Sequence, residues 1–378
     1  MFKGYSSIQN HYMKGVVDFQ FEPNFSREVE WVVTEKVHGS NFSYVVSVRE
    51  NAELDIQVAK RTEILVAGDP SYYPIAVQKV REIYDKKMPI LFKRVSEIVD
   101  ENFKITVNRV NVFGELFGGH YPHKEVQNVN GRVPIQRHVY YHTEFDFYIF
   151  DIYFSGVEKE TLKEKQFFLP YDLFVKALSE CEFNCYAKEI FRGTFEECLK
   201  FDCVFDSIIP SYYGLPGLPH HTNICEGIII KPAKDMYTQK RERMIIKKKN
   251  DAFNEKIGQA KKTKQKDHTK TSSDESRFTH EKGEQVFEDV TNYINENRLE
   301  ATISKLGDIF KFHKLREQAI YLLAQDALKD YKDENSELWN ELPKEDQKTI
   351  SRALPKISQR FVDTYVKERM EENENKEN

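Results

Sequence analysis

The chain has 378 residues, more than one hydrophobic core usually holds, so we expect two domains. It is 40% hydrophobic and 31% charged, with a formal net charge of −5 that is too small to indicate a partner. The sequence contains no run of about 18 apolar residues and no signal-peptide centre in its first twelve positions, and its five cysteines are too few for a disulfide scaffold. We therefore expect a soluble intracellular protein without membrane contact, either cytoplasmic or encoded by a virus or phage.

Short strand-forming runs separated by turns dominate the chain from about residue 32 to residue 249. They are rich in Val, Ile, Phe and Tyr, and several alternate. The runs cover residues 31–33, 42–48, 54–60, 105–116, 145–152, 226–232 and 243–249. Between them, helices are predicted within 73–99, where Ile75, Val80, Ile83 and Tyr84 fall at helical spacing, and within 170–181, which opens on Pro170.

Four cysteines have a spacing that resembles a zinc site, namely Cys181, Cys185, Cys198 and Cys203. The segment 191–203, however, has the pattern of a partly amphipathic helix, and buried reduced cysteine is common in intracellular proteins. We therefore expect these four residues to be reduced thiols and not zinc ligands.

The character of the sequence changes between Asn250 and Glu281, where apolar residues almost disappear. Residues 240–270 hold 12 lysines or arginines against 4 acidic residues, a net charge of +8. This run is either a solvated linker or a path for a polyanion that continues from the preceding strand. We expect domains at 1–255 and 285–378, joined by a basic linker at 256–284.

The region after the linker has helical periodicity in place of strand alternation. Three apolar helix faces are predicted, with members Val286, Val290, Tyr293 and Ile294, then Leu315, Ala319, Leu322, Leu323 and Ala327, then Ile350, Leu354, Ile357, Phe361 and Tyr365. The second domain should therefore consist of helices only.

Charged residues stand within or at the ends of the predicted strands, where a charge is costly unless it is paired or used. They are Lys36, Lys60, Arg61, Glu115, Asp151, Glu226, Lys231, Lys247 and Lys249. Each alone is typical of a surface position, but cations and carboxylates that converge from strand ends suit a triphosphate and divalent metals. The chain has no phosphate loop, no dinucleotide-binding glycine motif and no H-E-x-x-H motif.

Six stretches in order resemble motifs I, Ia, III, IIIa, IV and V of the covalent nucleotidyltransferases, which include ATP-dependent ligases and mRNA capping enzymes. They are EKVHGSNF, AKRT, FGELFGG, FYIFDI, EGIIIKP and IIKKKN. His38, the N-terminal MFKGYSSIQNHY and the stretch NRLEATISKLGDI from Asn297 are similar to the RNA ligase 2 family, typified by a bacteriophage enzyme and the kinetoplastid RNA-editing ligases. This resemblance implies an α+β fold. An ATP-grasp-like adenylyltransferase domain with antiparallel sheets would precede a small all-α domain.

The resemblance also implies a role for each motif residue. Lys36 would be the nucleophile that becomes linked to AMP, and Lys247 and Lys249 would contact the α-phosphate. Glu115 would bind the ribose, and Phe150 would stack on adenine. The nucleotide pocket would comprise Glu35, His38, Gly39, Asn41, Lys60, Arg61, Glu115, Phe150, Glu226 and Lys231, with Glu226 and Asp151 as metal ligands.

Strand alternation refines the expected side-chain directions. It places Phe150 on the face of Asp146 and Tyr148, a mixed face suited to a wet pocket. It also places Lys247 and Lys249 on one face and Lys248 on the other.

The implied activity is ATP-dependent RNA ligation with Mg²⁺ or Mn²⁺. A monomer would join 5′-phosphate and 3′-hydroxyl RNA ends through lysyl-AMP and RNA-adenylate, at nicks in duplex RNA. DNA ligases and GTP-using capping enzymes share the motifs but usually carry an oligonucleotide-binding β domain where helices are expected here. An NAD-dependent ligase would need an additional N-terminal domain, and a non-catalytic RNA-binding protein with the same fold is a further alternative. His120, His123, His138 and His142 are interpreted as surface or RNA-facing residues.

Overall fold

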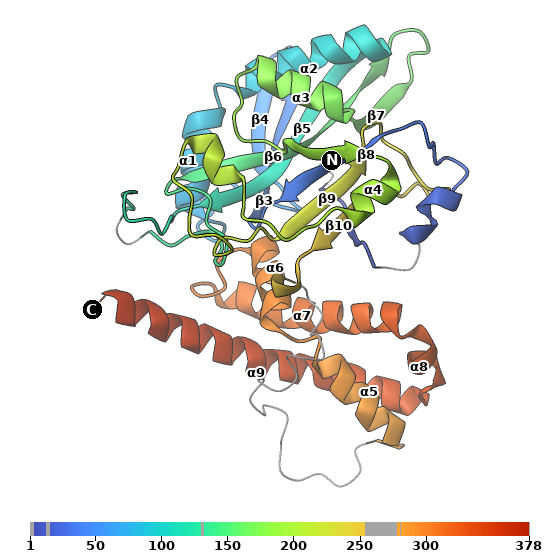
Figure 1. Ribbon diagram of the computed structural model, residues 1–378, viewed down its shortest axis with the longest axis vertical. Coiled ribbons are helices and arrows are strands. Elements are labelled where there is room, and N and C mark those ends of the chain that lie inside the picture. Colours follow the sequence, from blue (N-terminus) through green and yellow to red (C-terminus); the bar gives the residue numbers. More distant parts are fainter. Residues whose placement is uncertain (1–3, 13–15, 130–131, 254–277, 280, 378) are drawn as a thin grey trace. The chain divides into compact units, whose positions relative to one another are not determined.

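The computed structural model describes residues 4–12, 16–129, 132–253, 278–279 and 281–377. The chain divides into two compact units, Met1–Ala252 and Phe253–Asn378, the latter orange to red in Figure 1. Most of the predicted linker, 256–284, lies outside the described residues, and helix α5 (Glu281–Thr291) begins inside it. Among the helices described, none is both long enough and apolar enough to span a membrane.

Two five-stranded sheets form the N-terminal unit. Sheet A has the order β1 (Gln9–Asn10), β10 (Ile246–Lys249), β9 (Gly227–Pro232), β2 (Trp31–Lys36) and β8 (Glu189–Gly193). Sheet B has the order β4 (Leu54–Ala59), β3 (Ser40–Val48), β5 (Ile105–Gly118), β6 (Phe145–Glu158) and β7 (Glu164–Phe168). All neighbours are antiparallel except β1 and β10. The predicted antiparallel α+β fold is confirmed.

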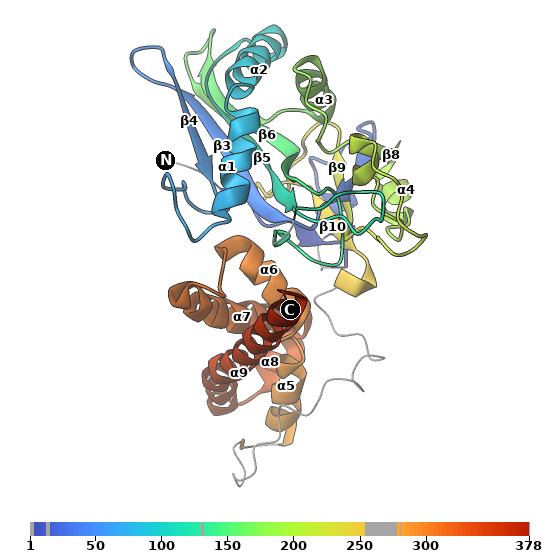
Figure 2. The same cartoon turned by 90° about the vertical axis from the view of Figure 1, so that its left-hand side faces the viewer.

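Helices cover these sheets. Figure 2 shows α1 (Pro74–Tyr84) and α2 (Met88–Phe103) along one side of sheet B, with α3 (Tyr171–Glu180) beside α2. The predicted segment 73–99 thus forms two helices, because Pro89 lacks an N–H and cannot continue α1. Ile75 and Ile83 are 65% and 47% exposed, so the predicted face was wrong for these two residues. The face of α1 that is buried consists of Ala76, Val80 and Tyr84, spaced four residues apart.

Sheet A has its own cover. Helix α4 (Phe195–Lys200) begins with a capping box in which Thr194 and Glu197 bond reciprocally, and it packs on β2. The predicted helix at 191–203 is therefore shorter than expected, since its first residues belong to β8. Cys198 and Cys203 are free thiols buried in this core. Among the described residues, none of the groups of possible metal ligands contains a cysteine. Among the described residues, short 3₁₀ segments lie at Val17–Phe21, Ile209–Tyr213 and Asp251–Phe253.

The C-terminal unit is helical throughout its described part, as predicted. After α5 come α6 (Glu296–Leu306), α7 (His313–Glu334), α8 (Ser336–Glu341) and α9 (Lys344–Glu377). One hydrophobic core unites them, with Val286, Val290, Ala319, Leu323, Ala327, Ile350 and Leu354 among its buried members. All seven were predicted on the apolar helix faces.

Candidate active site

Lys36 is the last residue of β2, and the short turn after it carries the chain from sheet A to sheet B. Buried Trp31, Val32 and Val33 hold β2 inside sheet A. Gly227 at the start of β9 pairs with Lys36 on one side and with Lys249 of β10 on the other. The register therefore brings Lys36 and Lys249 to the same level, one strand apart.

Glu226 precedes Gly227 and binds both lysines. Lys36 Nζ donates to Glu226 Oε2 at 2.7 Å, Lys249 Nζ lies 3.0 Å from Oε1, and His38 Nδ1 lies 3.6 Å from Oε2. Burial would raise the pKa of this carboxyl, but the Lys36 and Lys249 ammonium groups outweigh burial and hold the pKa well below its usual range. Glu226 is therefore an anion shared by two lysines.

Glu115 approaches the same turn from sheet B, where it pairs with Asn41 of β3. Burial raises the pKa of Glu115, against the lowering effect of the Lys36 charge, and the Glu226 carboxylate raises it further. A Cβ at Gly39 would lie 2.4 Å from the Leu116 carbonyl oxygen and 3.0 Å from Glu115 Oε2. Only glycine permits this close approach of the turn to β5.

Tyrosine hydroxyls hold the backbone on both sides of Lys36. Tyr148 of β6 donates to the Glu35 carbonyl oxygen at 3.0 Å, and the Tyr141 hydroxyl accepts the His38 N–H at 2.8 Å. Both rings are buried. The backbone around the nucleophile is therefore fixed by groups from β6 and from the segment that precedes it.

A third tyrosine acts at the start of β3, where the Tyr72 hydroxyl donates to the Asn41 carbonyl oxygen. Neither Tyr72 nor Tyr141 was predicted as a site residue. No motif marks either residue, and the only available signal was the high tyrosine content, 20 in the chain.

The Glu35 side chain lies apart from the Lys36 contacts. Consecutive residues of a strand point to opposite faces, and Glu35 Oε2 accepts the N–H of Ile208 at 2.9 Å. Burial raises the pKa of Glu35 to about 7, against the lowering effect of hydrogen bonds from Ser207 and Ile208. Glu35, which was predicted in the nucleotide pocket, thus contacts the Ile208 backbone and not the groups around Lys36.

Lys60 and Arg61 follow the end of β4. Lys60 Nζ lies 2.6 Å from Glu63 Oε1 and 6.0 Å from the centre of the Tyr72 ring. Arg61 Nη2 donates to Ser7 Oγ at 2.7 Å, so Arg61 is tied to the N-terminal segment.

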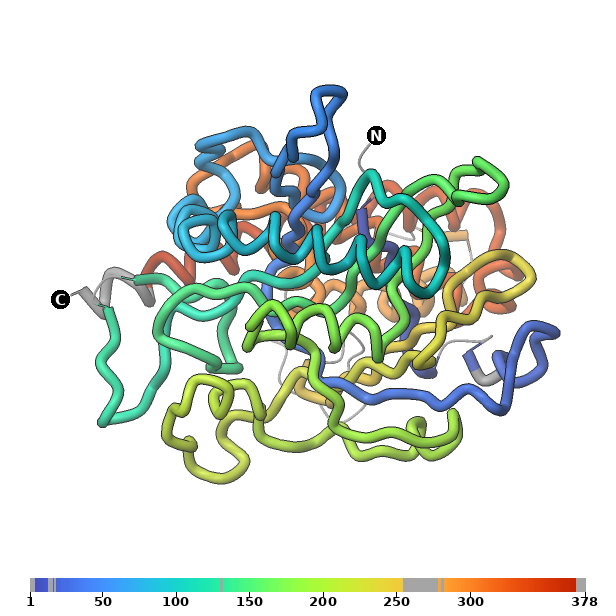
Figure 3. The backbone as a smooth tube through the Cα atoms, turned by 90° about the horizontal axis from the view of Figure 1, so that it is seen from above, coloured from blue at the N-terminus to red at the C-terminus, as the bar shows by residue number. Residues whose placement is uncertain are grey.

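The same N-terminal segment reaches motif V. β1 pairs with β10, with Asn10 opposite Lys247, and the His11 N–H donates to the Lys247 carbonyl oxygen at 3.0 Å. Figure 3 shows the dark blue segment beyond β1 running beside the yellow segment that precedes β10, where the Gln239 N–H donates to Glu22. Lys248 Nζ donates to carbonyl oxygens at the end of α4, away from Glu226, which agrees with the predicted alternation.

Asp151 and Lys231 form a separate buried cluster. Lys231 Nζ donates to Asp151 Oδ1 at 3.0 Å, and Arg243 and Tyr5 bind Oδ2. Burial would raise the pKa of Asp151, but Arg243 and Lys231 outweigh it and lower the pKa. Asp151 was predicted as a metal ligand, but both of its carboxylate oxygens are engaged in ion pairs. Arg243, which no motif in the sequence marks, completes the set.

Phe150 occupies a β-bulge. Phe113 of β5 pairs with Asp151 and Gly114 pairs with Ile149, so Phe150 has no partner in the register. The bulge breaks the alternation used to place Phe150 with Tyr148, which is buried and not part of a wet face. The ring of Phe150 is half-buried and contacts Tyr5 edge-on, with 4.9 Å between centroids.

The four histidines between β5 and β6 do not form a cluster of possible metal ligands among themselves within the described residues. His142 is half-buried, with its ring 4.2 Å from that of Tyr213, so it is less exposed than predicted.

A family model described as RNA ligase matches residues 29–249, from just before β2 to the end of β10. The chain belongs to the RNA ligase family. A second model, described as T4 RNA ligase 2 C-terminal, matches residues 277–360. The predicted family assignment is thereby confirmed. The described C-terminal residues of this ligase form helices, where a DNA ligase or capping enzyme would carry a β domain.

Two relatives come from Trypanosoma brucei brucei. RNA-editing ligase 1, mitochondrial, is 27% identical over 380 residues, covering 91% of this chain and 78% of the relative. RNA-editing ligase 2, mitochondrial, is 26% identical over 367 residues, covering 89% and 84%.

Solved structures with similarity include a Naegleria gruberi RNA ligase mutant with ATP and Mn, at 13% identity and a TM-score of 0.37, covering 66% of this chain. An archaeal ATP-dependent RNA ligase has 16% identity and a TM-score of 0.33, covering 66% of this chain. This ligase spans 57% and 48% of the lengths of those two chains.

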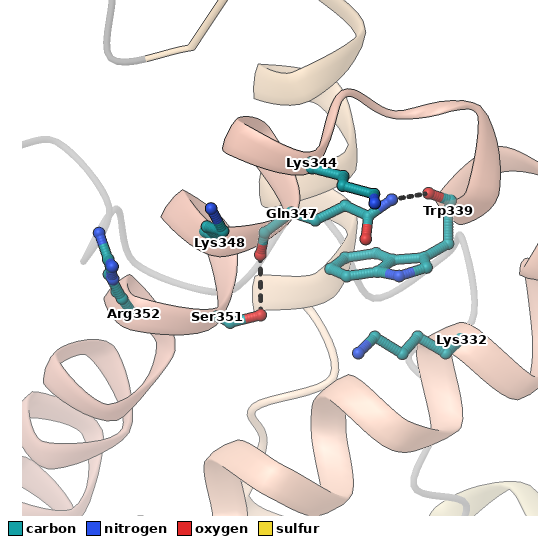
Figure 4. Close-up of a pocket in the computed structure, with 7 residues that line it drawn as sticks. All are labelled: Lys332, Trp339, Lys344, Gln347, Lys348, Ser351 and Arg352. Atoms are coloured by element: carbon teal, nitrogen blue, oxygen red, sulfur yellow. Dashed lines mark hydrogen bonds between the residues drawn. The ribbon is translucent and has the colours of Figure 1, made fainter.

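A basic pocket of about 370 Å³ lies in the C-terminal unit of the ligase, at the end of α7, α8 and the start of α9 (Figure 4). It is lined by Lys332, Trp339, Lys344, Gln347, Lys348, Ser351 and Arg352. Lys332 Nζ lies 4.4 Å from the centre of the Trp339 ring, and Lys348 pairs with Glu345 at 3.0 Å. Within the described part of the chain, the structure gives no ion-pair partner for the other cations of the pocket. The lining of the pocket is therefore positively charged.

Proposed function

We propose that this ligase joins RNA ends with Lys36 as its nucleophile and ATP as the nucleotide. Lys36 Nζ attacks the α-phosphate, forms a phosphorus–nitrogen bond and displaces pyrophosphate. AMP then passes to the 5′-phosphate of one RNA end, and the 3′-hydroxyl of a second end displaces AMP to form the phosphodiester. The observation that carries this proposal is the buried Glu226 carboxylate, shared by Lys36 and Lys249 beside the close-packed turn at Gly39.

Each group in the pocket has a distinct part in the first stage. The Lys36–Glu226 contact must open before attack, because an ammonium that donates to a carboxylate has no free electron pair. Lys249 and Lys247 would then stabilise negative charge on the α-phosphate. Glu115, close to the same turn, would accept a ribose hydroxyl.

The ionised Glu226 fits a divalent metal, since carboxylate oxygens are ligands that Mg²⁺ and Mn²⁺ prefer, and Glu115 is a second carboxylate beside it. When bound there, the metal would supply positive charge to the phosphates. Lys36 and Lys249 bind the two Glu226 oxygens, but the Lys36 contact must open before attack and would free Oε2 for the metal. Asp151 has no such reason to be released, because Lys231, Arg243 and Tyr5 hold both of its oxygens in a separate cluster.

We further propose that a monomer acts on nicks in duplex RNA. The basic pocket of the C-terminal unit offers a second set of cations for phosphates. Two anion-binding sites on separate units suit an extended RNA better than a single nucleotide at a strand end. Sealing rates on nicked duplex RNA, nicked DNA and single-stranded RNA test this, and equal rates on all three would contradict it.

The experiment for the whole proposal is covalent labelling with α-labelled ATP and Mg²⁺. The native chain should acquire acid-stable label, Lys36→Ala should not, and Lys234→Ala, which removes an exposed lysine of the same unit, should be labelled normally. Labelling by GTP in place of ATP would indicate a capping enzyme. Absence of any label, with RNA binding retained, would indicate a non-catalytic RNA-binding protein.

A further inference from the structure

Three metal-ligating side chains meet on a surface loop that the ligase motifs do not include. Asp206, His220 and His221 can each offer one ligand atom, and these atoms all lie within 4.8 Å of one another. His220 Nδ1 is 3.2 Å from Asp206 Oδ2, and the two imidazole rings are 3.9 Å apart between centroids. From this arrangement we propose that Asp206, His220 and His221 bind a zinc ion.

The backbone holds the carboxylate in position for such a role. The His221 N–H donates to Asp206 Oδ2 at 2.9 Å, and the Asn223 N–H donates to Oδ1 at 3.1 Å. Two backbone hydrogen bonds to one carboxylate fix its position beside His220 and His221.

The ligand set and its spacing suit zinc. Imidazole nitrogens and a carboxylate oxygen are common zinc ligands, and three protein ligands leave a fourth position for water. With bonds of about 2.0 to 2.1 Å, a tetrahedral zinc separates neighbouring ligand atoms by about 3.3 Å. The 3.2 Å between His220 and Asp206 fits this value. The His220 side chain is 80% exposed, so rotation can adjust the remaining distances.

The zinc would close a loop that leads into the active site. Asp206 forms a β-bridge with Ile224, Ser207 N–H donates to the Asn223 carbonyl oxygen at 2.8 Å, and Cys225 N–H donates to the Phe205 carbonyl oxygen at 2.9 Å. The residues that follow on each side are Ile208, which binds Glu35, and Glu226, which binds Lys36. A metal clip between Asp206 and the histidines would therefore stabilise the base of the Glu226 segment.

Zinc titration of the full untagged chain against a chromophoric chelator tests the proposal without ATP or RNA, so its outcome is independent of the sealing reaction. One zinc per chain should bind, and Asp206→Asn, His220→Ala and His221→Ala should each weaken binding at least about tenfold. His313→Ala is the matched control, because it removes an exposed histidine that lies beside a carboxylate, Glu317, elsewhere in the chain.

Two further readouts apply to the same proteins. Co²⁺ should give visible absorption bands in the native chain that disappear in the three variants, and zinc should slow proteolysis of the segment between residues 206 and 220 in the native chain only. Failure of the native chain to bind zinc would overturn the proposal. Zinc affinities of the three variants that equal the affinity of the native chain would also overturn it.

Discussion

Glu35→Gln should change how the stability of the N-terminal unit depends on pH. The Glu35 residue is 1% exposed, and burial raises its pKa from 4.5 to about 7. Between these values the unfolded chain loses the proton while the folded chain keeps it, so the free energy of unfolding falls as pH rises. At about 1.4 kcal/mol per pH unit, the pKa difference of about 2.5 units lowers the free energy of unfolding by roughly 3 kcal/mol. This loss is complete above about pH 7.

Urea unfolding at pH 5 and pH 8 measures this effect. On a Trp339→Phe background, Trp31 is the only tryptophan and reports the unit that contains Glu35. Because glutamine carries no charge at either pH, Glu35→Gln should gain about 2.5 kcal/mol relative to its parent between pH 5 and pH 8.

Glu160→Gln serves as the control, since this exposed glutamate in the turn after β6 should leave the pH dependence of the parent unchanged. If Glu35→Gln follows the parent within about 0.5 kcal/mol at both pH values, Glu35 is ionised in the folded unit and the reasoning from burial is refuted.

Three other predictions concern the site and its surroundings. Tyr141→Phe leaves the buried His38 N–H of the lysine turn without its acceptor. Single-turnover lysine adenylylation should therefore slow by roughly 5-fold to 150-fold, equivalent to about 1 to 3 kcal/mol. An unchanged rate would show that the turn does not need this bond. Lys344→Ala with Arg352→Ala should weaken RNA binding and reduce its logarithmic salt slope by roughly 2, with adenylylation unaffected, whereas an unaltered slope would exclude phosphate contacts there. Asp151→Asn should cost about 3 to 5 kcal/mol in urea unfolding because it leaves buried cations unpaired, and Asp55→Asn, from a more exposed ion pair, should cost less than about 1 kcal/mol.

Much of the fold and the chemical identity of the site could be predicted from local patterns. Alternating β-branched and aromatic residues indicated the strands, and helical periodicity after residue 281 indicated the C-terminal helices. Lys36 and Glu226 were identifiable because the short stretches around them resemble ligase motifs, whereas a charge at a strand end is by itself typical of a surface position. These signals depend on neighbours within a few residues, and for that reason they are visible in the sequence.

The pairing of the charges was decided only by the tertiary structure. Glu226 lies between Lys36 and Lys249 because Gly227 pairs with both strands, and this register joins residues about 190 positions apart. The bulge at Phe150 interrupts the alternation from which its side-chain direction was predicted. The hydroxyl of Tyr141 reaches the lysine turn across 103 positions. Such contacts are set by strand register and by side-chain packing between distant segments, and neither has a local signature in the sequence.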